Sequence, residues 1–186
     1  MSAAGTREAF QIKIVLAETD PPVWRRLQVP VGLSLARLHR AIQAAFGWED
    51  EHAHLFRVHG REYGPRSADP ALALKAETTT LASLRVAVGD VFAYEYGLEE
   101  AWTHLLTVEE RLRPGTPLEG PVCVAGRMAC PPEGSGGPYA FRERLAAAED
   151  PSHPEHGQAR AFFPAGWESS RFDRESANAA LRTARG

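Results

Sequence analysis

The strongest constraint in this 186-residue sequence is an alternation of apolar and polar residues that recurs through its first half and beyond. A period of two residues predicts strands with one buried face. The predicted strands cover residues 9–18, 23–29, 53–59, 91–96 and 102–109. Pro21 and Pro22 separate the first two strands, because proline lacks the N–H group that a sheet needs. We therefore expect these two strands to pair as a hairpin.

Residues 34–46 have helical periodicity instead. Leu35, Leu38 and Ile42 recur at helical spacing and form one apolar stripe. Gly47 follows directly, and glycine readily adopts the left-handed conformation that ends many helices. This segment is therefore predicted to be a helix that packs its stripe on the sheet.

The last third of the chain is richer in helical and turn signals. Residues 113–137 are rich in proline and glycine and are predicted to be loop, and residues 151–157 are predicted to be a turn. Helices are expected at about 138–148 and 173–184. Strands first and helices last predict an α+β fold. We expect a mixed or antiparallel sheet with the helix at 34–46 and the C-terminal helices packed on it.

The composition is that of a globular chain. Apolar residues make up 44% of the sequence, charged residues 24%, and the net charge is -3, which argues against disorder and against bulk attraction to nucleic acids. The N-terminus lacks the apolar segment of a signal peptide, and no apolar run could span a membrane. Arginine far outnumbers lysine, as in GC-rich bacterial genomes. We expect one cytoplasmic domain over residues 1–186, with a flexible N-terminus at residues 1–8.

Several short motifs are specific when their order and spacing are taken together. They are Pro21-Pro22-Val23-Trp24-Arg25-Arg26, Leu38-His39-Arg40-Ala41-Ile42-Gln43, Phe46-Gly47-Trp48 with His54, Gly89-Asp90-Val91-Phe92-Ala93-Tyr94-Glu95-Tyr96-Gly97, Trp102-Thr103-His104, Cys123-Val124-Ala125-Gly126, Cys130-Pro131-Pro132-Glu133 and Gly136-Gly137-Pro138-Tyr139. From about residue 10 to about residue 182, the chain resembles the plasmid pRiA4b open reading frame three family. The resemblance implies a compact α+β domain with no assigned activity. It also implies relatives whose genes are often carried by plasmids and insertion elements.

The sequence departs from the family pattern at two places. Glu95 and Leu98 stand where the family has aspartates in a hairpin, with two extra residues before Trp102. Gly134 replaces the acid that usually follows the Cys-Pro-Pro-Glu motif. If those acids form a family site, the resemblance implies that this chain retains fewer of its acidic residues.

Ligand-type side chains give the first candidate site. His54, His104, Cys123 and Cys130, with Glu95 near them, offer the imidazole, thiolate and carboxylate groups that bind zinc. However, six residues separate the two cysteines, more than in a usual zinc knuckle. We favour the alternative in which the cysteines are small buried hydrophobes and the histidines bond to neighbours, so that no cofactor is bound. Two cysteines are also too few for a disulfide-stapled secreted domain.

Acid–base chemistry is the second candidate. Glu95, His104 and Glu133 could act together, because a carboxylate near an imidazole fixes its tautomer and shifts its pKa. Glu95 and His104 lie on adjacent predicted strands and meet only if their side chains share a face. Ordinary cross-strand pairing is the alternative that we favour.

A basic face is the third candidate. Arg25, Arg26, Arg37 and Arg40 could contact nucleic-acid phosphates. His39 and Arg40 lie off the helical stripe and are expected to be exposed. A solvated surface is the interpretation that we favour.

These observations predict a small binding or interaction domain, linked by the resemblance to mobile elements, with an unidentified partner such as another protein. The alternatives are a metal-dependent or acid–base enzyme using the region of His54, Glu95, His104 and Cys130, and a nucleic-acid accessory protein. We lean against an enzyme, because no complete catalytic motif is present.

Overall fold

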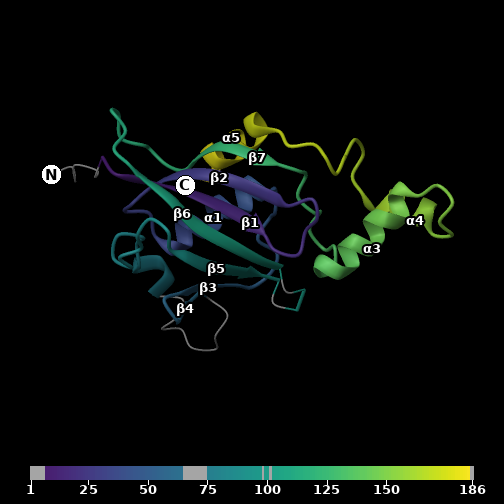
Figure 1. The fold of residues 1–186 in the computed structure, drawn as a ribbon, viewed down its shortest axis with the longest axis horizontal. Helices are drawn as coiled ribbons and strands as arrows, with labels where there is room; N and C mark the ends of the chain where they lie inside the picture. Colours follow the sequence, from purple (N-terminus) through teal and green to yellow (C-terminus); the bar gives the residue numbers. More distant parts are fainter. Residues whose placement is uncertain (1–6, 65–74, 98, 101, 185–186) are drawn as a thin grey trace.

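The strands form one antiparallel sheet. The computed structural model describes residues 7–64, 75–97, 99–100 and 102–184. Its seven strands lie in the order β4-β3-β5-β6-β1-β2-β7, and all pairings between them are antiparallel (Figure 1). The strands are β1 (Ala9–Leu16), β2 (Val23–Pro30), β3 (His54–Val58), β4 (Arg61–Tyr63), β5 (Val91–Tyr96), β6 (Trp102–Leu112) and β7 (Val122–Arg127).

The expected hairpin between the first two strands is present. β1 and β2 pair from Leu16 opposite Val23 to Ala9 opposite Pro30. β1 also pairs with β6, so the first strand of the chain lies inside the sheet rather than at its edge. The pairing with β6 contains a register shift between Gln11 and Ile12, but the two-residue period along β1 itself puts Ile12, as well as Leu16, on the buried face.

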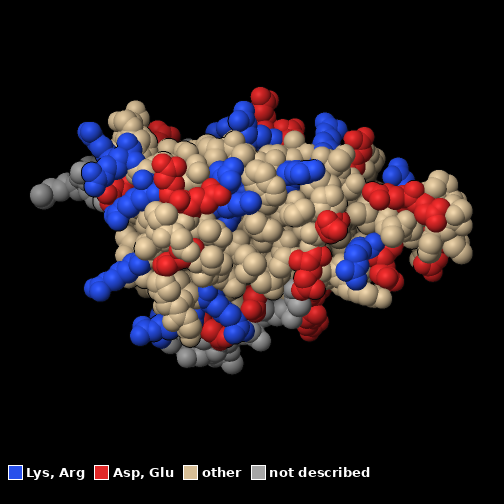
Figure 2. Space-filling model, in the orientation of Figure 1, with Lys and Arg blue, Asp and Glu red and all other residues tan. Residues whose placement is uncertain are grey.

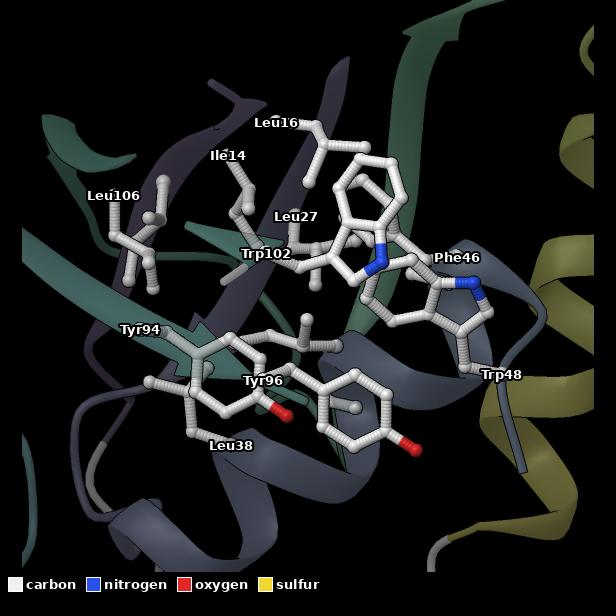
Figure 3. Close-up of a cluster of buried hydrophobic side chains, with 14 of the residues drawn as sticks. Ile14, Leu16, Leu27, Leu38, Phe46, Trp48, Tyr94, Tyr96, Trp102 and Leu106 are labelled. Atoms are coloured by element: carbon white, nitrogen blue, oxygen red, sulfur yellow. The ribbon is translucent and has the colours of Figure 1, made fainter. Parts of the chain in front are cut away.

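Helix α1 (Leu35–Phe46) covers one face of this sheet. The Ser34 side chain accepts a hydrogen bond from the Arg37 backbone N–H, and Gly47 ends the helix at a φ of 78°. Leu38 and Ile42 are fully buried, as the stripe predicts. Figure 3 shows Leu38 in one cluster with apolar side chains from β1, β2, β5 and β6.

The C-terminal helices occupy two places. Helix α5 (Arg174–Thr183) packs on β7 and α1, whereas α3 (Gly137–Glu149) and α4 (His156–Phe162) pack on each other at one end of the sheet (Figure 1). Phe141 of α3 meets Trp102 edge-on, with ring centroids 6.2 Å apart. The expected α+β fold is confirmed, and the sheet is antiparallel. In the described residues no helix is both long and apolar enough to cross a bilayer.

The structure corrects the expected element list in three segments. β4 pairs with β3 at residues where no strand is expected. β7 lies within residues 113–137, where proline and glycine predict only loop, because a short apolar run there pairs with β2. α4 begins at His156, where a turn is expected. The N-terminal residues 1–6 of the expected flexible segment, and Leu98, lie outside the described residues.

We predict that Leu38→Ala lowers the free energy of unfolding by about 2–5 kcal/mol, because the substitution leaves a cavity between α1 and the sheet. Val88→Ala, at a side chain that is 57% exposed, should change it by less than about 0.5 kcal/mol. Equilibrium denaturation in urea measures both. Equal, small effects of the two substitutions would show that the stripe does not form the core.

Candidate functional site

The site begins on the face of α1 that meets β5. His39 and Gln43 are one helical turn apart, and both are buried. The Tyr94 hydroxyl lies 2.8 Å from Nδ1 of His39 and accepts a hydrogen bond of 2.9 Å from Nε2 of Gln43. The expectation that His39 is exposed is therefore wrong. A polar side chain is buried beside the apolar stripe because β5 offers it a hydrogen-bonding partner.

The loop after α1 brings a carboxylate to the same place. Asp50 adopts a φ of 61°, and its backbone N–H donates to Oε1 of Gln43 at 3.0 Å. Its Oδ1 atom lies 3.0 Å from Nε2 of His39. The two atoms are not aligned as a hydrogen bond, and Nε2 has no other partner in the described residues. A buried ring nitrogen therefore faces the carboxylate without a good hydrogen bond.

His54, the first residue of β3, completes the cluster. Its ring stacks on that of His39, with centroids 3.5 Å apart and an interplanar angle of 9°. One ligand atom each from His39, Asp50 and His54 lies within 4.8 Å of the other two. We call these three residues the histidine–aspartate cluster. Two imidazoles and a carboxylate are a ligand set for zinc and similar divalent ions.

Burial keeps both imidazoles of this cluster neutral at pH 7. Desolvation lowers the pKa of His39, and desolvation together with the neighbouring His39 ring lowers the pKa of His54 to about 3. Neutral imidazole is the form that binds metals. Each of the two rings therefore has one unprotonated nitrogen, whose lone pair can bind a metal ion without prior loss of a proton.

Glu133 organises the loop that carries Asp50. Its carboxylate accepts hydrogen bonds from the Tyr96 hydroxyl and from the backbone N–H groups of Glu49, at 2.6 Å, and Glu51, at 3.3 Å. Figure 3 shows the hydroxyls of Tyr94 and Tyr96 pointing the same way, away from the aliphatic core. Glu133 thus serves as an anchor of the loop, and its carboxylate is occupied by these donors.

The candidate pairing of Glu95 with His104 does not form. Their strands are in a register that sets Tyr94 opposite His104 and Glu95 opposite Thr103. Successive side chains of a strand point to opposite faces. His104 therefore points into the core, whereas Glu95 lies on the other face and pairs with Arg57 at 2.9 Å.

His104 is sealed in the aromatic core. It is 0% exposed, and neither ring nitrogen has a hydrogen-bond partner in the described residues. The rings of Phe46 and Trp48 meet it edge-on, at 4.8 and 5.2 Å. Burial lowers its pKa to about 3, so it is uncharged.

The cysteines lie apart from the histidine–aspartate cluster. Of the four candidate metal ligands, His54 belongs to a three-donor group in the described residues, whereas His104, Cys123 and Cys130 belong to none. Both cysteines are free thiols, and burial raises the pKa of each. A shared four-ligand site is therefore not assembled.

The four arginines do not form one basic face. Arg25 is 3% exposed, and Arg26 points to the opposite face of the sheet, where it pairs with Glu109 at 2.6 Å. Arg37 and Arg40 are exposed on α1. On the face seen in Figure 2, basic and acidic side chains are interspersed. A surface shared by all four candidate arginines is therefore not formed, because Arg25 is buried.

Comparison with known proteins identifies the family. The sequence pattern of the family described as "Plasmid pRiA4b ORF-3-like protein" matches residues 8–176. The chain belongs to this family. The resemblance seen in the short motifs is thus confirmed.

Two other proteins are similar to this pRiA4b ORF-3-like chain over most of its length. "Uncharacterized protein y4hQ" of Sinorhizobium fredii is 33% identical over 172 residues, which cover 90% of this chain and 85% of that protein. The crystal structure of a protein of unknown function, MM3350 from Methanosarcina mazei Go1, is similar with a TM-score of 0.82 and 27% identity. That match covers 90% of this chain and 96% of the other. The shared fold is therefore shown, and neither description names an activity.

Sequence reasoning missed His39 and Asp50, although a signal for His39 was present. His39 and Gln43 lie one turn apart in the motif Leu38-His39-Arg40-Ala41-Ile42-Gln43, on the edge of the stripe. No local pattern marks Asp50, because its position depends on hydrogen bonds to Gln43 and on the anchoring of its loop by Glu133.

We predict that stability falls as the pH drops from about 6.5 towards 3, because the unfolded chain takes up protons that buried His104 does not. His104→Leu removes this titration at similar volume. It should reduce the slope of unfolding free energy against pH by up to about 1.4 kcal/mol per pH unit. Urea denaturation at a series of pH values measures the slope, and the exposed His153→Gln is the control. An unchanged slope in His104→Leu would contradict the buried, neutral state.

Proposed function

We propose that this chain is a small binding domain whose ligand is a divalent metal ion of the zinc class, held by His39, Asp50 and His54. The observation that carries the proposal is the convergence of three ligand atoms within 4.8 Å of one another. The residues come from α1, the loop after it and β3, so folding brings them together.

The surroundings of the cluster support metal binding. A metal-bound histidine usually donates its other ring N–H to a fixed acceptor. When Nε2 of His39 binds the ion, Nδ1 keeps its proton and donates to the Tyr94 hydroxyl, 2.8 Å away. Gln43 fixes both Tyr94 and the backbone of Asp50. The second layer of contacts is thus in place for two of the three ligands.

The stacked rings imply that binding changes the local geometry. Lone pairs of imidazole nitrogens lie in the ring planes, and the planes of His39 and His54 are parallel within 9°. Lone pairs in parallel planes do not converge on one ion, so binding tilts the rings apart. The ion then replaces the ring stacking with two coordinate bonds.

Three protein ligands leave at least one coordination position for water or for a donor from another molecule. The proposal covers ion binding and names no reaction at that position. A further part of the proposal is that the domain serves a plasmid or an insertion element. The family description, which names a plasmid reading frame, supports that part.

Calorimetric titration of untagged, chelator-treated protein with Zn²⁺ tests the proposal. We expect one ion per chain, and we expect Asp50→Asn to weaken binding at least about 10-fold, because it removes an anionic ligand. Asparagine tolerates the positive φ of this position, so the loop keeps its conformation.

Glu49→Gln is the matched control, since it removes the same charge from the adjacent residue outside the cluster. It should bind Zn²⁺ like the wild type. Absence of stoichiometric binding to the wild type, or equal affinities of Asp50→Asn and Glu49→Gln, would contradict the proposal.

A further inference from the structure

Arg25 is a cation buried inside the fold. It lies on β2, is 3% exposed, and its guanidinium carbon lies 5.1 Å from the ring centroid of Phe46 and 4.2 Å from that of Phe172. Both contacts are within the range of cation–π interactions, so aromatic rings form much of the surroundings of this charge.

Three of the five N–H donors of Arg25 are used by the backbone. Nε donates to the Ala45 carbonyl at 3.0 Å, and Nη1 donates to the carbonyls of Trp24 at 2.8 Å and Arg127 at 3.0 Å. Nη2 makes no hydrogen bond to the described residues and is not among their fully buried unpartnered atoms, so it retains some contact with solvent. The Nη2 edge is therefore the part of the guanidinium that a ligand can reach.

The charge of Arg25 is not balanced by an acid. No carboxylate of the described residues lies within 4.0 Å of it. The titratable groups that face it are the thiols of Cys123 and Cys130, which burial holds in the neutral form. Burying an unpaired charge is costly, and an anion beside Nη2 would offset that cost.

A cavity of about 360 Å³ lies beside this guanidinium. Arg25 lines it together with apolar side chains that include Trp167 and Phe172, and Arg171 adds a second cation. The carboxylate of Asp173, also in the lining, caps α5 by accepting hydrogen bonds from the Glu175 and Ser176 backbones at 2.9 and 3.1 Å. Arg25, Arg171 and the Asp173 carboxylate together give the lining of the cavity a single net positive charge.

We propose that this cavity binds a small organic monoanion, a carboxylate with an apolar body. The carboxylate bonds to Nη2 of Arg25 and to Arg171, and the apolar body packs on Trp167 and Phe172. A single net positive charge favours a monoanion over a phosphate dianion, and the volume is in the range of small-molecule sites. This site is separate from the histidine–aspartate cluster, none of whose residues line the cavity.

Benzoate is the probe, with neutral benzamide as its isosteric control and inorganic phosphate as the dianion. Titrations followed by NMR chemical shifts should show benzoate binding at least about 10-fold more tightly than benzamide, the difference expected of a charge-assisted hydrogen bond. Phosphate should bind more weakly than benzoate.

Substitutions locate the binding in the cavity without disturbing buried Arg25. Ala180→Leu puts a bulkier side chain into the lining and should weaken benzoate binding, whereas Ala179→Leu, the next residue and outside the lining, should leave it unchanged. Arg171→Gln should weaken binding several-fold, and Asp50→Asn should have no effect.

Three results would overturn the proposal. They are equal affinities for benzoate and benzamide, tighter binding of phosphate than of benzoate, and benzoate binding in Ala180→Leu that matches Ala179→Leu. Failure of wild-type protein to bind benzoate at all would overturn it as well.

Discussion

The packing of α1 on the sheet is the contact on which the rest of this structure depends. The apolar stripe that includes Leu38 and Ile42 is fully buried against strands from both halves of the sheet. The same contact fixes how far the helix is rotated about its axis, so it decides that His39 and Gln43 face Tyr94. The candidate site is thus built on the edge of the main hydrophobic interface.

Burial then sets the chemistry of the polar groups at this interface. His39 and His54 are desolvated, so they are neutral and stack on each other. Asp50 lies at the surface, with 54% of its side chain exposed, so its carboxylate can be reached from solvent. A buried neutral donor pair beside an exposed carboxylate is an arrangement that a divalent cation can join from solvent.

Local periodicity made five of the strands and α1 predictable, because their signals lie within a few consecutive residues, whereas it did not reveal β4 and β7. Non-local contacts set the rest. The faces of Glu95 and His104 depend on strand register, in which a shift of one residue exchanges the two faces. Burial of His39 depends on a hydroxyl 55 residues away. The position of Asp50 depends on Glu133, which follows β7 in the sequence and accepts a hydrogen bond from the backbone of the loop that carries Asp50.

Anomalous diffraction at the zinc absorption edge, from crystals of untagged protein grown with Zn²⁺, tests the central claim most directly. The account predicts one strong peak about 2.0–2.2 Å from a ring nitrogen of His39, a ring nitrogen of His54 and an Asp50 oxygen, with the two rings tilted apart. A structure with Zn²⁺ bound elsewhere, or with the two rings still stacked and no peak between them and Asp50, would contradict it.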